Sequence, residues 1–141
     1  MQRRATAVWE GGLKDGKGRI STESRALADT PYSFGTRFEG APGTNPEELL
    51  GAAHAGCFSM ALSLQLGEAG IRPERIETKA TITFEKLDTG FTITRSHLDV
   101  TVRAPGADRA KFEQAAQNAK VGCPLSKVLK AEVTMDARLE S

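Results

Sequence analysis

The pattern of hydrophobic and polar positions divides the chain into one long apolar segment and several alternating ones. The apolar segment, 43–70, reads GTNPEELLGAAHAGCFSMALSLQLGEAG and holds Cys57, the first of only two cysteines. Apolar residues fall on every face of a helix drawn through it, as in a helix buried in a core or a membrane. Asn45 as N-cap, with Glu48 three residues later, predicts its start, and Gly70 predicts its end. We predict a single long helix, buried nearly all round.

Alternation of apolar and polar residues predicts strands on both sides of this helix. The segment 27–38 is expected to form a loop that leads into a short strand. Regular strands are expected at 4–10, 18–24, 74–88, 91–103 and 133–139, and further helices at 107–119 and 124–129. This order is typical of an α+β domain. We therefore predict one domain over residues 1–141, with an antiparallel sheet packed on the long central helix.

Charge and composition exclude several classes of protein. The chain has 19 basic and 18 acidic side chains, so it lacks the basic surplus expected of a nucleic-acid binder. Residues 5–12 contain Thr6 and Glu10, which do not fit the apolar core of a signal peptide. The apolar segment begins with two acids and carries His54 and Ser59, so we predict a soluble core helix with no membrane partner. We expect a cytoplasmic protein, and in that compartment two cysteines are more often redox-active or metal-ligating than structural.

The two cysteines stand in different local settings. Burial in an apolar helix raises the pKa of a thiol, so a reactive Cys57 requires a nearby cation, and Arg37 is the candidate. Cys123 precedes Pro124 at the predicted start of a short helix, where unsatisfied N–H groups lower the pKa of a thiol. By this reasoning Cys123 is the better nucleophile and equally the better leaving group of a disulfide. The local chemistry leaves open which cysteine attacks a substrate.

Two segments resemble a known family. YSFGTRFEGAPGTNPEELLGAAHAGCFSMAL and VGCPLSKVLKAEVTM closely resemble the OsmC (osmotically inducible protein C) branch of the OsmC/Ohr family of thiol peroxidases, and the resemblance covers essentially the whole chain. It implies an OsmC-like interlocked homodimer with active sites at the interface. It also implies reduction of organic hydroperoxides, and more weakly of hydrogen peroxide, in oxidative and osmotic stress defence. The electron donor would be an external dithiol of the lipoyl type, and no cofactor is implied.

The resemblance also implies roles for four residues. By motif position Cys57 matches the peroxidatic cysteine and Cys123 the resolving cysteine, while Arg37 matches the arginine that activates the thiolate and Glu47 its carboxylate partner. Glu47 and Cys57 are ten residues apart on one predicted helix, about 15 Å along its axis. One arginine spans that distance poorly. We therefore hypothesise that the Glu47 beside a given Cys57 belongs to the partner subunit.

Other interpretations of these residues remain. A four-ligand metal site is conceivable, but structural zinc sites pair their ligands closely in sequence, and we expect no metal. Its ligands would be His54, Cys57, His97 and Cys123. More simply, His54 is a polar group near the interface, His97 an exposed strand residue and Ser126 an ordinary helix residue. The alternative function is a redox or metal-binding stress sensor that uses the same cysteines without turnover.

Overall fold

The computed structural model describes residues 1–140, and the chain forms two compact units. The N-terminal unit comprises residues 1–49, and the C-terminal unit begins at Leu50. The boundary lies in the first turn of the long helix α2 (Pro46–Glu68), so Glu47 belongs to the N-terminal unit and Cys57 to the C-terminal unit.

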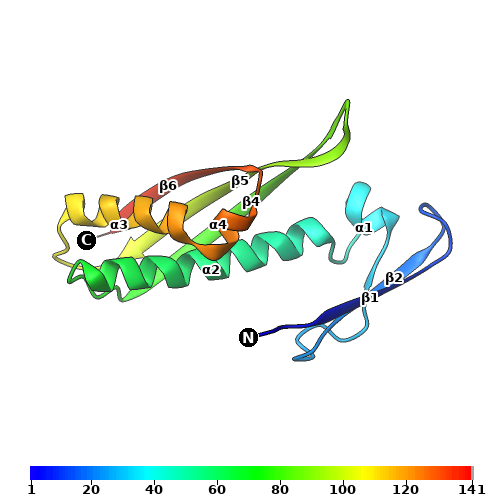
Figure 1. The fold of residues 1–141 in the computed structure, drawn as a ribbon, viewed down its shortest axis with the longest axis horizontal. Coiled ribbons are helices and arrows are strands. Elements are labelled where there is room, and N and C mark those ends of the chain that lie inside the picture. Colours follow the sequence, from blue (N-terminus) through cyan, green and yellow to red (C-terminus); the bar gives the residue numbers. More distant parts are fainter. Residues whose placement is uncertain (141) are drawn as a thin grey trace. The chain divides into compact units, whose positions relative to one another are not determined.

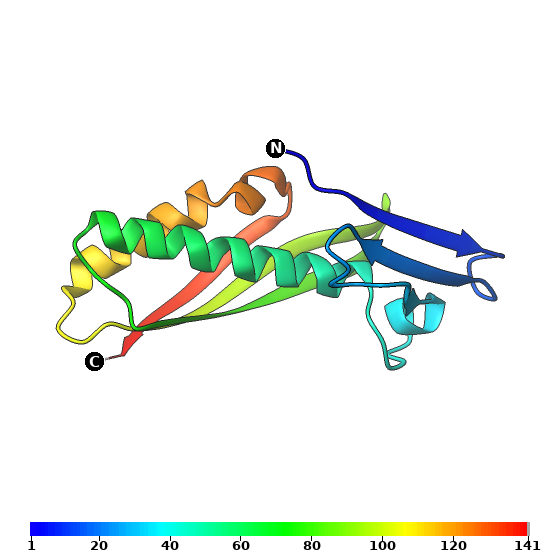
Figure 2. The ribbon, with the colours of Figure 1, turned by 90° about the horizontal axis from the view of Figure 1, so that it is seen from below.

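The N-terminal unit is a small antiparallel sheet. Its strands β1 (Ala5–Glu10), β2 (Lys17–Thr22) and β3 (Thr30–Tyr32) follow one another in spatial order (Figures 1 and 2). The rings of Trp9 and Tyr32 meet with centroids 5.5 Å apart. Gly18 lies between them, and a Cβ at this position would clash with the Tyr32 ring and lie 2.7 Å from Trp9 Cε3. Only glycine therefore fits beneath this aromatic pair.

The segment after β3 is helical, which corrects the predicted order of a loop followed by a strand. Helix α1 (Phe34–Phe38) directly follows β3 and carries Arg37. Ser33 Oγ accepts a hydrogen bond from the Thr36 N–H, and Thr36 Oγ1 accepts one from the Ser33 N–H. This reciprocal capping satisfies two backbone donors that have no partner within the helix. The short helix forms because of this Ser-x-x-Thr pair, which the alternation pattern does not reveal.

Helix α2 begins as predicted. The Asn45 side-chain oxygen accepts a hydrogen bond from the Glu48 N–H at 2.8 Å, which confirms the N-cap. The Glu48 carboxylate, in turn, accepts a hydrogen bond from the Thr44 hydroxyl at 2.8 Å. By length and composition α2 is the one helix among the described residues that could cross a membrane, a test that the core helix of a soluble protein also passes.

The prediction that α2 is buried on all sides is wrong for the single chain. One stripe is buried, and it follows helical spacing through Gly51, His54, Phe58, Leu62 and Leu66. On the opposite side Met60 is 78% exposed and Leu64 is 61% exposed. Apolar residues on every face of a helix predict that other parts of the protein pack against every face. In the single chain, the C-terminal unit packs against only one face of α2.

The C-terminal unit contains a second three-stranded sheet with helices on one face (Figures 1 and 2). Strands β4 (Arg75–Leu87) and β5 (Gly90–Arg103) form an antiparallel hairpin. Strand β6 (Glu132–Glu140) lies parallel to β5, which corrects the prediction of a wholly antiparallel sheet. The connection between these strands runs through α3 (Arg109–Gly122) and α4 (Pro124–Val128). These helices return the chain to the end of the sheet from which β5 runs, so β6 runs in the same direction as β5.

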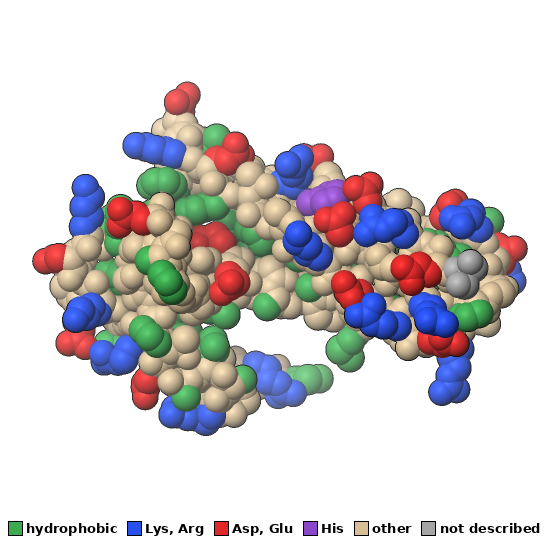
Figure 3. Space-filling view, turned by 180° about the vertical axis from the view of Figure 1, so that it is seen from behind, with side chains coloured by type: hydrophobic (Ala, Val, Ile, Leu, Met, Phe, Trp, Pro, Cys, Tyr) green, Lys and Arg blue, Asp and Glu red, His purple; other side chains and the backbone are tan. Residues whose placement is uncertain are grey.

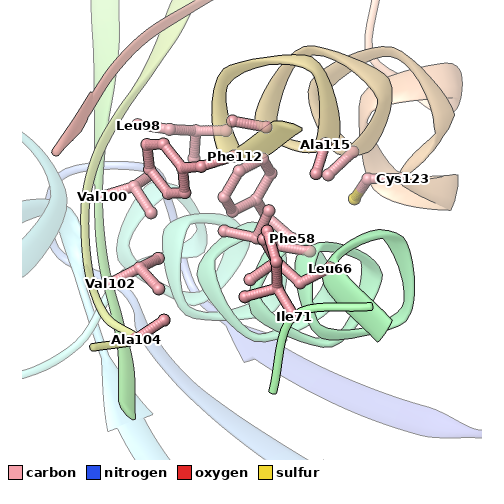
Figure 4. Close-up of a cluster of buried hydrophobic side chains, with 13 residues drawn as sticks. Phe58, Leu66, Ile71, Leu98, Val100, Val102, Ala104, Phe112, Ala115 and Cys123 are labelled. Carbon is pink, nitrogen blue, oxygen red and sulfur yellow. The ribbon is translucent and has the colours of Figure 1, made fainter. Parts of the chain in front are cut away.

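The hydrophobic core lies between this sheet and its helices. Phe58 and Leu66 of α2 contact a layer formed by Phe112 of α3 and the inner face of β5 (Figure 4). Residues Leu98, Val100 and Val102 supply that inner face and have no exposed surface. Cys123 lies at one end of the cluster and is also fully buried (Figure 4). The outer face of the sheet carries interspersed acidic and basic side chains (Figure 3).

Candidate active site

The C-terminal unit brings the two thiols together. Cys57 lies on α2, and Cys123 lies in the junction where α3 ends and α4 begins. Their sulfur atoms are 2.9 Å apart and both cysteines are free thiols. A disulfide has an S–S bond of about 2.05 Å, so the two sulfurs need only a small further approach to bond. The sequence alone placed these residues 66 positions apart; the fold makes them a pair.

Cys57 has an unfavourable setting for a thiolate within its own unit. Burial raises the pKa of the Cys57 thiol, and the neighbouring Cys123 sulfur raises it further. A backbone hydrogen bond from Leu125, in the first turn of α4, lowers the pKa of Cys57. Desolvation penalises the charged form, as the sequence predicted for a thiol in an apolar helix. A reactive Cys57 therefore requires a positive charge from outside these groups.

The N-terminal unit contains an arginine that is held by a carboxylate. Arg37 Nε donates to both carboxylate oxygens of Glu47, at 3.1 and 3.3 Å, and Arg37 Nη2 donates to Oε1 at 2.7 Å. Glu47 is 8% exposed. The guanidinium carbon also lies 5.4 Å from the centre of the Phe38 ring. A two-point contact fixes the plane of a guanidinium more firmly than a single hydrogen bond does.

Each unit has an apolar hollow beside its candidate pair of residues. In the N-terminal unit, Arg37 borders a cavity of about 240 Å³ whose walls include the rings of Trp9, Tyr32, Phe34 and Phe38. In the C-terminal unit, Cys57 borders a groove of about 550 Å³ that also contains Met60, Leu64 and Pro124. Both hollows are lined mainly by carbon. Such surroundings suit an organic substrate better than a small polar one.

His54 connects both cysteine-bearing elements to the sheet, which the sequence did not suggest. Its Nδ1 is 2.7 Å from Ser96 Oγ of β5, and its Nε2 is 2.9 Å from Ser126 Oγ of α4. His54 and Ser96 have no exposed surface. Burial lowers the pKa of His54, so its neutral form is favoured. His54 is thus a buried residue of the C-terminal unit and Ser126 is its partner, which corrects the prediction that Ser126 is an ordinary helix residue.

The conceivable four-ligand metal set does not assemble. Adjacent residues of a strand point to opposite faces, so His97 lies on the outer face of β5 while Ser96 meets His54 on the inner face. His97 Nδ1 is 2.6 Å from Thr134 Oγ1, and its Nε2 lies 3.5 Å from Asp99 and 3.2 Å from Asp136. Its side chain is 27% exposed, so His97 is half-buried. The prediction that it is simply exposed is therefore corrected.

Comparison with known proteins decides the family. The model of the family of OsmC-like proteins matches residues 38–138 of the chain. The chain belongs to the OsmC-like family. It is 55% identical over 141 residues to peroxiredoxin OsmC of Escherichia coli K12, covering 100% of this chain and 99% of that protein. It is 34% identical over 124 residues to the organic hydroperoxide resistance protein OhrB of Bacillus subtilis, covering 87% and 88% of the two chains.

Solved structures of the family share the fold. The crystal structure of Bacillus subtilis OhrB aligns with a TM-score of 0.68 at 26% identity, covering 97% of this chain and 98% of that one. An OsmC-like protein of unknown function from Vibrio cholerae aligns with a TM-score of 0.77 at 15% identity, covering 97% and 99%. The predicted α+β, OsmC-like fold is confirmed. Within the matched range lie Glu47 and both cysteines, and Arg37 directly precedes it.

Proposed function

We propose that this protein is a thiol-dependent peroxidase that reduces organic hydroperoxides, and hydrogen peroxide more weakly. The observation that carries the proposal is the pair of free sulfurs 2.9 Å apart, one buried and one bordering an open groove. The relatives named above as a peroxiredoxin and an organic hydroperoxide resistance protein support it.

Cys57 is the peroxidatic residue and Cys123 the resolving one. The Cys57 thiolate attacks the terminal oxygen of ROOH; an S–O bond forms, the O–O bond breaks, and the alkoxide leaves as ROH after taking a proton. The resulting sulfenic acid condenses with the Cys123 thiol, so that the disulfide forms and water leaves. Groove access distinguishes the two roles, because Cys57 borders the groove while Cys123 has no exposed surface.

Arg37 supplies the positive charge that Cys57 requires, and Glu47 orients it. An opposite charge within about 4–6 Å lowers the pKa of an acid by roughly 1–3 units, which is comparable with the effect of burial. The guanidinium also stabilises the negative charge that develops on the departing oxygen. The two-point contact with Glu47 keeps the plane of Arg37 fixed, so little rearrangement is needed during the reaction.

The Arg37–Glu47 pair beside a given Cys57 comes from the partner subunit of a homodimer. Glu47 and Cys57 are ten residues apart on α2, about 15 Å along its axis. The apolar face that carries Met60 and Leu64 is exposed in the single chain and is the surface that a second copy would cover. Within each chain, residues 1–141 act as one OsmC-like domain, which is supported by the family match that runs across both units from residue 38 to residue 138.

The substrate and the electron donor follow from the same chemistry. The aromatic cavity beside Arg37 and the groove beside Cys57 favour an organic group on the hydroperoxide. A small dithiol, such as a lipoyl group, returns two electrons to the Cys57–Cys123 disulfide and leaves as its own cyclic disulfide. A reducing cytoplasm maintains such donors, and the protein acts there in defence against oxidative and osmotic stress.

A consumption assay tests the proposed function. Purified protein is mixed with cumene hydroperoxide and dihydrolipoamide, and the loss of hydroperoxide is followed in parallel with hydrogen peroxide. Sustained turnover, faster for the organic substrate, is expected. Oxidation that stops after one equivalent in the presence of excess dithiol would instead identify a sensor without turnover.

A further inference from the structure

One buried polar network in the C-terminal unit has no part in the two chemical steps. It consists of Ser96, His54 and Ser126, which come from β5, α2 and α4. A neutral imidazole has one donor nitrogen and one acceptor nitrogen, and a serine hydroxyl can serve either. Both nitrogens of His54 therefore find a partner, and no buried side-chain N or O atom among the described residues is left without one.

The network joins the two elements that carry the thiols. His54 lies three residues before Cys57, so both lie on neighbouring positions of the same helix. Ser126 lies three residues after Cys123, on the short helix that Cys123 caps. The contact between His54 Nε2 and Ser126 Oγ, at 2.9 Å, thus runs alongside the contact between the two sulfurs.

Besides this contact, helix α4 is held by Leu125, which packs against the hydrophobic core and whose backbone hydrogen-bonds Cys57, and by the buried Cys123 at its N-cap. The helix is five residues long, none of its residues is fully buried, and no side chain caps its N-terminus. Val128 at its end is 73% exposed. The contact between His54 and Ser96 is the better anchored end of the network. Ser96 lies in the middle strand of the sheet, and neither residue has any exposed surface.

We propose that His54 is a positioning residue that, through Ser126, holds helix α4 and hence Cys123 against Cys57, and thereby sets how fast the sulfenic acid is resolved. The inference rests on the proposed peroxidase function. Two reactions compete for Cys57–SOH. Condensation with Cys123–SH gives the disulfide and water, whereas a second ROOH gives the sulfinic acid and ROH. The first is intramolecular, so its rate depends on how well the two sulfurs are held.

The test is a partition experiment with Ser126→Ala. Protein cycles with dihydrolipoamide at increasing cumene hydroperoxide, and mass spectrometry measures the sulfinic acid on Cys57 per turnover. Loss of one hydrogen bond corresponds to about three- to tenfold in a rate constant, so sulfinic acid per turnover should rise about three- to tenfold. Rapid-mixing fluorescence should show the same loss in the rate of disulfide formation.

Ser59→Ala is the matched control. Ser59 Oγ is 2.8 Å from Thr78 Oγ1, so this hydroxyl also ties α2 to the sheet, but it does not touch α4. Ser59→Ala should lose comparable stability and leave the partition at the wild-type value. His54→Gln, whose amide reaches the position of Nε2, should be closer to wild type than His54→Asn, whose shorter amide reaches only toward Ser96.

The outcomes separate the inference from the function beneath it. Wild-type partition in Ser126→Ala, or an equal rise in Ser59→Ala, overturns the positioning role while peroxidase turnover stands. A wild-type protein that consumes no hydroperoxide overturns the proposed function itself. If His54→Asn fails to fold, Ser126→Ala and Ser59→Ala alone decide.

Discussion

The two units of this chain differ in how they are built and in what they supply. The C-terminal unit has a core of 13 buried hydrophobic residues, and every one of them lies at or after Phe58. The N-terminal unit has no member of that core among the described residues. This unit holds an aromatic pair, the Arg37–Glu47 ion pair and a cavity, and most of its side chains are exposed.

This contrast has a chemical counterpart. The well-packed unit brings two sulfurs to 2.9 Å but leaves Cys57 with a raised pKa, because packing removes the water that would stabilise a thiolate. The sparsely packed unit holds the guanidinium, oriented by Glu47. The thiol pair and the Arg37–Glu47 pair thus lie in different units. A small sheet with few buried residues is marginally stable alone, so the same unit is also the one that most needs a partner surface.

The largest expected effect is the loss of a sulfur from the C-terminal unit. Cys57→Ser should lower hydroperoxide consumption by more than about 1,000-fold, because a serine hydroxyl is scarcely ionised at neutral pH. Cys123→Ser is the matched variant and should still oxidise once, leaving a sulfenic acid that a dimedone probe traps on Cys57. If Cys123→Ser is silent and Cys57→Ser is labelled, the roles of the two cysteines are reversed.

Removing the cation from the N-terminal unit should have the next largest effect. Arg37→Met should raise the pKa of the Cys57 thiol by about 1–3 units and slow the reaction at pH 7 by about 10- to 1,000-fold. Since only the thiolate attacks, activity should recover as the pH rises. The measurement is the pH dependence of sulfenic acid formation in Arg37→Met. Arg103→Met is the control, because Arg103 forms an ion pair with Glu74 in the C-terminal unit. An unchanged profile would mean that another cation serves Cys57.

Mixing two inactive variants tests whether Arg37 of one subunit acts on Cys57 of the other subunit in a dimer. A heterodimer of Cys57→Ser and Arg37→Met contains one complete site if Arg37 acts on the partner's cysteine. Equal mixing with random exchange should therefore restore about one quarter of wild-type activity, since half of the dimers hold one of two sites. Mixtures that stay inactive, although native mass spectrometry shows heterodimers, would place Arg37 and its Cys57 in the same chain.

The sequence predicted local features better than those set by the tertiary fold. The N-cap at Asn45 and most strands were predicted because capping and alternation are local signals. Helix α1 has a local signal as well, the Ser33-x-x-Thr36 pair, which the alternation of apolar and polar residues does not reveal. The parallel direction of β6 has none, because alternation reports which face a residue occupies and not which way the strand runs.

The candidate site shows the same limit. An apolar pattern on all faces of α2 predicts cover without saying which chain provides it, so burial in the single chain was overestimated. The His54–Ser126 contact joins residues 72 positions apart, and a histidine near one cysteine and a serine near the other carry no mark that they meet. Recognition of two motifs gave the four proposed site residues, and the fold gave the pairing of the sulfurs and of Arg37 with Glu47.

The smallest expected effect is a pH dependence of stability that distinguishes the two histidines of the C-terminal unit. Burial lowers the pKa of His54 below its unfolded value near 6.5. The unfolded state therefore binds more protons on the acid side, and the free energy of unfolding should fall as the pH drops below about 6.5, by at most about 1.4 kcal/mol per pH unit. Urea unfolding at pH 7.5 and 5.5 measures this slope. His54→Gln should flatten it whatever its stability at pH 7.5. His97→Gln removes a histidine from the outer face of the sheet, and this variant should keep the slope. An equal flattening of the slope in both variants would show that the acid sensitivity does not arise from the buried imidazole.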